Sequence, residues 1–386
     1  MTQQSSIVKY IGVDDHAIDL FEGQYRVPRG MSYNSYLVCD RLTAVMDTVD
    51  RRFITEWLRN IEAELGDRAP DFLVVHHMEP DHSSGIKAFM DKYPASRIVA
   101  SAKAYTMMKQ FFGTDFADRA VTAGEGFELE LGEHKLSFIT APMVHWPEVI
   151  MSFLSDVGAL FSADAFGKFG SLDARQSWDD ESRRYYFGIV GKYGAQVGAV
   201  LKKAASLPIK IICPLHGPAL EGDLSHYLDL YNTWSQYLPE EEGITVAFTS
   251  VYGHTRVVAE QIAETLRLHG ETVSVYDLSR DDMASAVADA FRFDRLLLAT
   301  TTYNMEMFPP MRTFLEELAE RGFKNRTVGL IENGTWAPAA AKKMAEKLGT
   351  MKDITILSPT VTIRSTLDQT SQSALDELSG ALQHKH

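Results

Sequence analysis

Cysteine is almost absent from this chain, whose 386 residues include only Cys39 and Cys213. The two lie far apart, so they can form neither a disulfide framework nor a Cys-x-x-Cys metal site. Long apolar runs are also missing, because stretches such as 295–300 fall far short of the roughly 18 residues that span a bilayer. The start, Met1–Lys9, lacks the basic-then-apolar layout of a signal peptide. These absences predict a cytoplasmic protein with no membrane contact.

Runs of basic residues are missing as well, and the net charge is −14. Without a basic stretch to neutralise phosphates, a nucleic-acid partner is not expected. The pairs Lys202-Lys203 and Arg183-Arg184 are isolated, and we interpret them as solvated surface. The acidic balance fits either simple solubility or a protein partner with a basic face.

The length exceeds that of one ordinary core and predicts two to three domains. The best boundary candidate is the segment 238–243, which combines a proline, three glutamates and a glycine. We therefore predict a domain over residues 1–242 and a second over residues 243–386.

The second half alternates short apolar, β-branched runs with helical stretches, a pattern that predicts a doubly wound parallel sheet. The strands are expected at 244–248, 272–276, 295–299, 327–331 and 354–357. The helices are expected at 255–268, 282–290, 311–321, 339–348 and 367–382. Five strands in about 140 residues is the size of a flavodoxin-type domain.

The first half is less regular, and its paired strands and separate helices predict a mixed-sheet sandwich with outer helices. The strands are expected at 35–39, 43–48, 72–75, 135–139, 149–153 and 159–162. The helices are expected at 53–65, 83–92, 102–112 and 188–206, and a further aromatic-rich helix at 224–237 precedes the boundary.

The densest chemistry of the chain follows the apolar strand at 72–75. His77, Glu79, Asp81 and His82 lie within six residues there, on a loop whose position at a strand end favours a site rather than a core. A lone histidine in such a place is usually structural. Two imidazoles and two carboxylates packed so tightly would suffer mutual repulsion and lose hydration. A bound cation relieves both of these unfavourable contributions. The cluster therefore predicts a metal site.

Three more candidate ligands end other predicted strands: His145, Asp164 and His216. Ligands from four strand ends at one edge of a sandwich are typical of the metallo-β-lactamase superfamily, which the chain resembles over roughly residues 30–235. That resemblance implies an α/β fold, an αββα sandwich. The superfamily's hydrolases carry His-x-His-x-Asp-His, but Glu79 stands here in place of the second histidine. Carboxylates mixed with imidazoles favour iron or manganese over zinc alone.

With Glu79, the pattern resembles that of flavodiiron proteins, the rubredoxin:oxygen and nitric oxide oxidoreductase family. The resemblance implies two non-haem irons. His77, Glu79 and His145 would hold one, Asp81, His82 and His216 the other, and Asp164 would bridge them. His76 is interpreted as structural or as a support, and Glu148 and backbone carbonyls are expected to accept hydrogen bonds from ligand imidazoles. Tyr25 and Tyr193 match positions of polar aromatics near the irons, but a buried tyrosine is as often a core residue.

Three loops of the second half resemble the FMN site of flavodoxins. The first joins a strand to a helix N-terminus, where hydroxyls and backbone N–H groups can hold a phosphate. Neither Gly-x-x-x-x-Gly-Lys nor Gly-x-Gly-x-x-Gly occurs, which disfavours a nucleoside triphosphate, FAD or NAD. The FMN candidates are Thr249, Ser250, Tyr252, Gly253, His254 and Thr255, then Thr302, Tyr303 and Asn304, and finally Asn333, Gly334, Thr335 and Trp336.

The resemblance implies an oxidoreductase in which an external donor such as rubredoxin reduces FMN, and FMN reduces a di-iron site that converts O2 to water or NO to N2O. It also implies a head-to-tail homodimer or a dimer of dimers. The choice between O2 and NO stays open. One alternative is a zinc-dependent hydrolase fused to a flavodoxin module. The other is an electron-transfer protein with a merely structural metal site.

Overall fold

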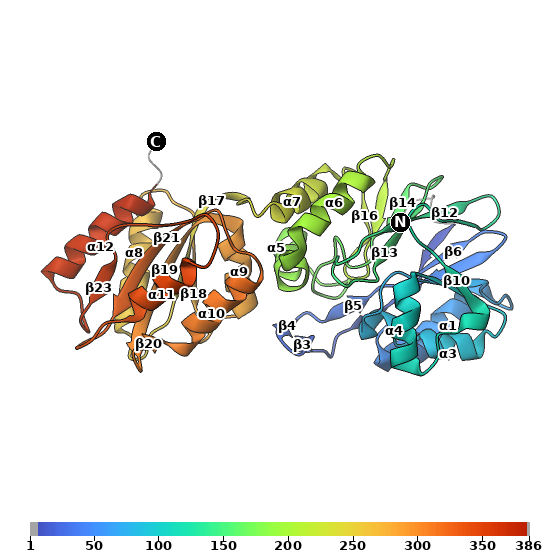
Figure 1. The fold of residues 1–386 in the computed structure, drawn as a ribbon, viewed down its shortest axis with the longest axis horizontal. Coiled ribbons are helices and arrows are strands. Elements are labelled where there is room, and N and C mark those ends of the chain that lie inside the picture. Colours follow the sequence, from blue (N-terminus) through green and yellow to red (C-terminus); the bar gives the residue numbers. More distant parts are fainter. Residues whose placement is uncertain (1–6, 384–386) are drawn as a thin grey trace. The chain divides into compact units, whose positions relative to one another are not determined.

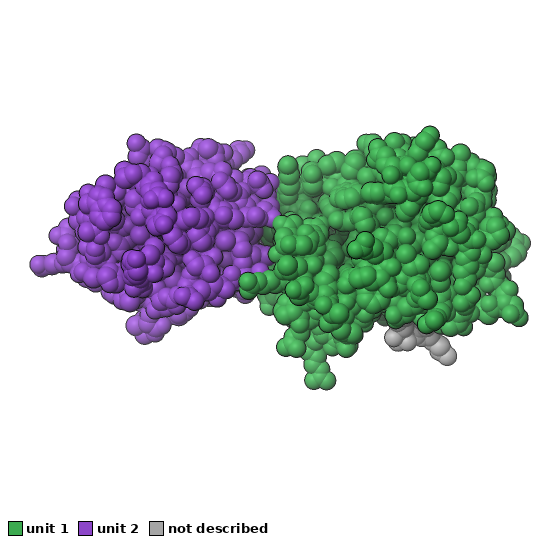
Figure 2. All heavy atoms as spheres, turned by 90° about the horizontal axis from the view of Figure 1, so that it is seen from below, with its two compact units in different colours: residues 1–232 green, residues 233–386 purple. Residues whose placement is uncertain are grey.

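The computed structural model describes residues 7–383, so most of the start judged above for a signal peptide lies outside it. The chain forms two compact units, Met1–Asn232 and Thr233–His386 (Figure 1, Figure 2). The predicted boundary falls ten residues later. The predicted link at 238–243 overlaps β17 (Glu241–Phe248), because that strand begins at the second of the three glutamates in the link. The predicted domain boundary after residue 242 stays a prediction.

The first unit contains two six-stranded sheets. The first has the order β1 (Val8–Tyr10), β6 (Tyr36–Cys39), β7 (Thr43–Met46), β8 (Phe72–Val75), β9 (Arg97–Ala100), β10 (Ala120–Thr122). The second has the order β11 (Glu128–Glu130), β12 (Lys135–Thr140), β13 (Ile150–Leu154), β14 (Ala159–Phe161), β15 (Ile211–Cys213), β16 (Leu220–Glu221). Two short pairs join β2 (Val13–Asp15) to β5 (Met31–Tyr33) and β3 (Leu20–Phe21) to β4 (Tyr25–Arg26).

The core of this unit lies between the two sheets. Alternate residues of the strands point inward, as period-two geometry requires. The buried cluster joins Val38, Met46 and Val74 of the first sheet to Phe138, Leu154 and Phe161 of the second. The predicted sandwich is therefore confirmed.

The helices of the first unit cover this sandwich (Figure 1). They are α1 (Ile54–Leu65), α2 (Pro80–Ser83), α3 (Ile86–Lys92), α4 (Ala102–Phe112), α5 (Trp178–Tyr185), α6 (Gly194–Ala204) and α7 (Ser225–Ser235). The helix expected at 83–92 is interrupted at Gly85, which lies against Thr48 and Trp57 too closely for a Cβ atom. The helix expected at 188–206 begins with a π turn and a 3-10 turn, so that regular α-helix starts only at Gly194.

The Arg183-Arg184 pair was interpreted as solvated surface, and this was wrong. Both side chains are buried on α5, a helix that the sequence analysis did not predict. Arg183 pairs with Asp180 at 3.0 Å and Arg184 with Glu181 at 2.8 Å, and the Arg184 guanidinium lies 4.4 Å from the ring centroid of Phe169. Neighbouring carboxylates and an aromatic face thus replace the water that isolated charges would need.

The second unit is the predicted doubly wound sheet. Its strand order is β18 (Val273–Asp277), β17, β19 (Phe293–Tyr303), β21 (Arg326–Asn333), β22 (Ile354–Ile356), all parallel. β20 (Glu306–Met307) and β23 (Val361–Ile363) pair with β19 and β21. The helices are α8 (His254–Leu268), α9 (Met283–Arg292), α10 (Pro309–Glu320), α11 (Ala340–Leu348) and α12 (Gln369–Leu382). The strand expected at 354–357 is β22, and β23, which was not predicted, pairs with β21 beyond Pro359.

Within residues 7–383, no helix has the length and apolar character needed to cross a membrane.

Candidate functional site

The predicted metal ligands sit on loops that follow four strands of the sandwich. β8 of the first sheet leads into the loop of His77, Glu79, Asp81 and His82, with Pro80 starting the short helix α2. In the second sheet, His145 follows β12, Asp164 follows β14 and His216 follows β15. Because β14 and β15 are parallel neighbours, their ends place Asp164 and His216 at the same edge.

Four of these residues form one compact group: His77, Glu79, His145 and Asp164. The Nε2 atom of His145 lies 3.0 Å from Glu79 Oε2 and 3.0 Å from Asp164 Oδ2. The Nε2 atom of His77 lies 3.2 Å from the same Glu79 oxygen and 3.3 Å from the same Asp164 oxygen. Two imidazoles and two carboxylates thus point their donor atoms at one small volume.

The other three residues form a second group: Asp81, His82 and His216. The Nε2 atoms of His82 and His216 lie 2.9 Å apart, and each is 3.3 Å from Asp81 Oδ2. The second oxygen of Asp164, Oδ1, faces this group at 3.5 Å from His82 and 3.9 Å from His216. Asp164 therefore stands between the groups, with one oxygen toward each.

Hydrogen bonds on the far side orient two of the imidazoles. Nδ1 of His77 lies 2.8 Å from Glu148 Oε1, and Nδ1 of His216 lies 2.6 Å from the backbone oxygen of Ser32. An N–H donated to an oxygen at Nδ1 leaves the lone pair at Nε2 free to face the group. Both kinds of acceptor were predicted, and these hydrogen bonds are confirmed.

His76 points away from the groups and anchors the start of the loop. Its Nδ1 contacts Asp47 Oδ2 at 2.5 Å and its Nε2 contacts the Ser152 hydroxyl at 2.8 Å, while its backbone N–H donates to Asp47 Oδ1. Both ring nitrogens are thus engaged, which agrees with the interpretation of His76 as a structural or supporting residue.

Neighbouring imidazoles lower the pKa of two carboxylates of the cluster, Glu79 and Asp164. Burial acts to raise the pKa of Glu79, but hydrogen bonds from His145 and His77 outweigh it and hold that pKa below its ordinary value. Burial likewise acts to raise the pKa of Asp164, but His77 and His145 outweigh it and hold that pKa well below its usual range. For His145 burial lowers the pKa, yet its contacts with Asp164 and Glu79 raise it to about 9.

Unsatisfied buried oxygens show that this donor set fits cations. Asp164 Oδ1 and both carboxylate oxygens of Asp81 are buried and make no hydrogen bond with any described residue, although imidazole nitrogens lie 3.3 Å from Asp81 Oδ2. Buried ionised oxygens without partners are costly unless a cation coordinates them. Four imidazoles and three carboxylates in two groups fit a pair of iron or manganese ions better than zinc alone.

The two tyrosines predicted near the metal site are placed differently. Tyr25 is buried, packs on Phe169 and donates its hydroxyl to the backbone oxygen of Gly188 at 2.7 Å. Tyr193 is half-buried and directly precedes α6, and it belongs to neither of the two ligand groups. Their role stays a prediction.

Two other residues near the cluster were not singled out by the sequence analysis. Tyr185 on α5 is fully buried, lies 5.5 Å ring to ring from His216, and its hydroxyl has no hydrogen-bond partner among residues 7–383. Glu22, in the turn between β3 and β4, faces Glu79; burial and the charge of Glu79 raise its pKa to about 7. Neither residue follows a predicted strand, so the pattern that led to the metal ligands does not apply to them. The adjacent tyrosines at 185–186 are the one sequence feature that could have drawn attention to Tyr185.

The predicted FMN loops meet at the carboxyl ends of β17, β19 and β21, which are neighbours in the sheet. Hydroxyls link them: Thr249 contacts Thr300 at 2.7 Å and Thr255 contacts Thr301 at 3.1 Å. Gly253 precedes α8 with a φ of 95°, a conformation that glycine adopts readily. No described side chain caps the first turn of α8, so its N–H groups are open to an anion such as a phosphate.

Aromatic side chains surround these loops without being packed into the core. Tyr252 is 92% exposed, Trp336 87% and Tyr303 48%, values that suit a flat aromatic ligand better than a packing role. Asn333 binds the loop after β23, donating to the backbone oxygen of Ser365 and accepting from its N–H. The sequence analysis missed this fourth loop.

Comparisons with known proteins give the same two-part division. The family described as "ODP family beta lactamase" matches residues 31–217, and the flavodoxin family matches residues 246–377. The anaerobic nitric oxide reductase flavorubredoxin of Aliivibrio fischeri is 29% identical over 354 residues, which cover 88% of this chain and 71% of that protein.

Solved structures match nearly the whole chain. Rubredoxin oxygen:oxidoreductase from Desulfovibrio gigas superposes with a TM-score of 0.90 at 23% identity, covering 97% of this chain and 96% of that one, and shows the common fold. A variant of the flavo di-iron protein from Thermotoga maritima superposes with a TM-score of 0.87 at 25% identity, with the same coverage.

Proposed function

Because the chain belongs to the flavodiiron proteins, we propose that it is an oxidoreductase that passes electrons from an external donor through FMN to two non-haem irons, where O2 is reduced to water or NO to N2O. The observation that carries this proposal is the pair of donor groups sharing Asp164, with Glu79 in the first of them. A flavodoxin unit in the same chain provides the source of electrons that such a centre needs.

The proposed ligands follow the two groups. His77, Glu79 and His145 hold one iron, Asp81, His82 and His216 hold the other, and Asp164 joins both. When bound, the iron pair supplies electrons and open coordination positions for a diatomic molecule. Around it, Glu148 and the backbone oxygen of Ser32 orient the imidazoles of His77 and His216.

The proposed FMN site uses the three predicted loops. The N–H groups at the start of α8, with Ser250 and Thr255, hold the phosphate, and Trp336 and Tyr303 contact the ring. When bound, FMN exchanges electrons singly or in pairs. Tyr25, Tyr193 and the newly found Tyr185 are proposed as hydrogen-bond donors near the substrate. Of the three, Tyr185 has the strongest support, since its hydroxyl is buried and lacks a partner among the described residues.

Assembly and partners belong to the same proposal. The donor is an external protein such as rubredoxin, and the active form is a head-to-tail homodimer or a dimer of dimers in the cytoplasm. Dilution below the dissociation constant of the dimer should abolish turnover while FMN stays bound. Full turnover by the monomer would contradict the dimer.

Anaerobic stopped-flow tests the function. The photoreduced protein, with iron and FMN quantified on the same sample, is mixed first with O2 and then with NO, and rapid flavin reoxidation is expected with at least one of them. Glu79→His should lower this reactivity, whereas Glu130→His on exposed β11 should not. Two bound zinc ions with hydrolytic turnover and no reaction with either gas would favour the fused hydrolase instead.

A further inference from the structure

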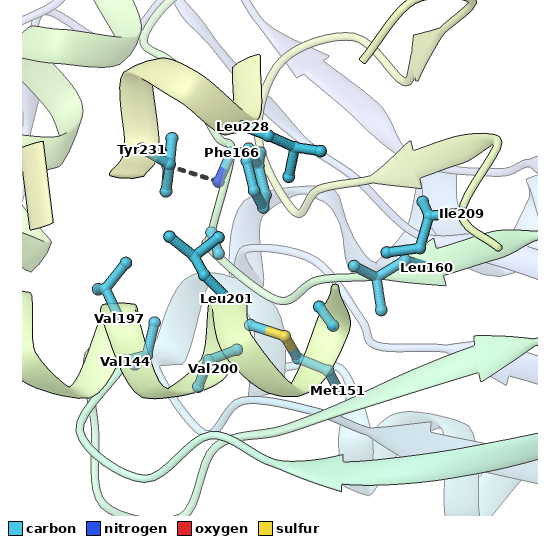
Figure 3. A pocket seen from close by; sticks show the side chains of 12 residues that line it. Val144, Met151, Leu160, Phe166, Val197, Val200, Leu201, Ile209, Leu228 and Tyr231 are labelled. Carbon is cyan, nitrogen blue, oxygen red and sulfur yellow. Dashed lines mark hydrogen bonds between the residues drawn. The ribbon is translucent and has the colours of Figure 1, made fainter. Parts of the chain in front are cut away.

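An apolar cavity of about 20 Å³ lies in the first unit, between α6, α7 and the strands β13 and β14 (Figure 3). Helix α6 contributes Val197 and Val200, and Met151 and Leu160 come from the two strands. The twelve lining residues are all apolar except Tyr231. The hydroxyl of Tyr231 is directed at the backbone N–H of Phe166, from which it accepts a hydrogen bond of 2.5 Å.

The chemistry of this lining selects the occupant. A water molecule needs about 10–15 Å³ of such space and two to four polar partners, and apolar cavities that lack such partners stay dry and bind apolar guests such as xenon. The cavity has room for one water-sized molecule but offers it no free partner among its lining side chains. An uncharged diatomic gas loses little by leaving water and fits the same volume.

The position of the cavity ties it to the metal cluster. Val144 and Ala165 line it and are the chain neighbours of His145 and Asp164, and both are almost fully buried. The lining also includes Leu201 on α6, which is only half-buried. The lining thus comprises both a half-buried residue and the chain neighbours of two of the ligands.

We propose that this cavity is a holding site for an uncharged diatomic molecule of the O2 and NO class, from which the molecule reaches the metal cluster past Val144 and Ala165. The proposal rests on the proposed function for the identity of the gas. The binding site itself is a property of the lining and can be tested without turnover.

Xenon tests the site in the full-length protein loaded with iron and FMN. Crystals pressurised with xenon should show one xenon atom against Met151 and Val200. Val200→Phe fills the cavity and should remove that atom, and Leu201→Ala should keep it. Ala199→Phe is the matched control, because Ala199 is exposed on the same helix. The absence of xenon from this cavity in the wild-type protein would overturn the proposal.

Kinetics then tests the route. Val200→Phe should lower kcat/KM for the gas by about tenfold, which corresponds to about 1.4 kcal/mol, with kcat at saturation, iron and FMN unchanged. Leu201→Ala removes side-chain volume from the lining instead of adding it, so it should raise or preserve kcat/KM. An unchanged kcat/KM in a folded Val200→Phe protein that no longer binds xenon would refute the route. If the loaded wild-type protein reacts with neither gas, the proposed function fails, while the xenon result still decides the site.

Discussion

Glu148→Gln tests whether the hydrogen bond behind His77 tunes the metal site. Glu148 Oε1 accepts from His77 Nδ1 at 2.8 Å and from the Met78 backbone N–H at 2.9 Å, and the residue is 2% exposed. Glutamine keeps an oxygen for both donors but removes the charge, and charge-assisted hydrogen bonds are about twice as strong as neutral ones.

The magnitude follows from the role of such supporting groups. Removing a hydrogen-bond partner of a ligand imidazole typically costs 10–100-fold in metal affinity, or about 1.4–2.7 kcal/mol. Because glutamine preserves the geometry, we expect about tenfold weaker binding for Glu148→Gln and the larger loss for Glu148→Ala.

The assay is an anaerobic competition titration of Fe²⁺ against a chelator, with circular dichroism to confirm the fold. Glu125→Gln is the matched control, since Glu125 accepts hydrogen bonds from Thr140 and Lys203 on the exposed surface. An unchanged iron affinity in well-folded Glu148→Gln would show that this contact does not support the site. Equal losses in both variants would show that the effect is one of overall charge.

Four further predictions concern both units. Tyr185→Phe should lower turnover with O2 or NO but leave iron content and Tm unchanged, because the lost hydroxyl has no partner among the described residues; a large fall in Tm would contradict this. Thr302→Ala should cost about 1 kcal/mol in urea unfolding, because its hydroxyl accepts from two N–H groups at the start of α11, and Thr302→Ser should restore it. Trp336→Ala should weaken FMN binding about tenfold in fluorescence titrations without destabilising the flavin-free protein, since the side chain is exposed. In the metal-free protein, Glu22 has a pKa raised from 4.5 to about 7, so its folded form holds a proton more tightly than the unfolded chain and stability falls as pH rises across that range. Glu22→Gln should therefore reduce the dependence of Tm on pH in thermal melts, and an unchanged dependence would show that Glu22 does not cause it.

The features that the sequence predicted well depend on local pattern. Helices mostly alternate with strands in the second unit, so the ten predicted segments fell close to the helices α8–α12 and the strands β17, β18, β19, β21 and β22. The seven candidate metal ligands lie close together because they are on loops after apolar strands, and parallel strands bring such loops to one edge; their role as ligands stays a prediction.

The features that were missed depend on contacts between distant segments. The burial of Arg184 requires Phe169 and Glu181 around it, and the place of Tyr185 beside His216 is fixed by packing across 31 residues of chain. β23 was not predicted, and Ser365 reaches the FMN loops because β23 pairs with β21, a distant segment of the chain.

Asp164 has a consequence for how the site fills. One carboxylate supplies an oxygen to each group, so a cation in either group fixes the side chain and withdraws negative charge that the other group also uses. If the two groups hold the proposed ions, the first would order the Asp164 side chain for the second, while competing with it for the same charge. Occupancies of the two positions are therefore linked, and a titration of the empty protein reports a joint property of the pair rather than two independent constants.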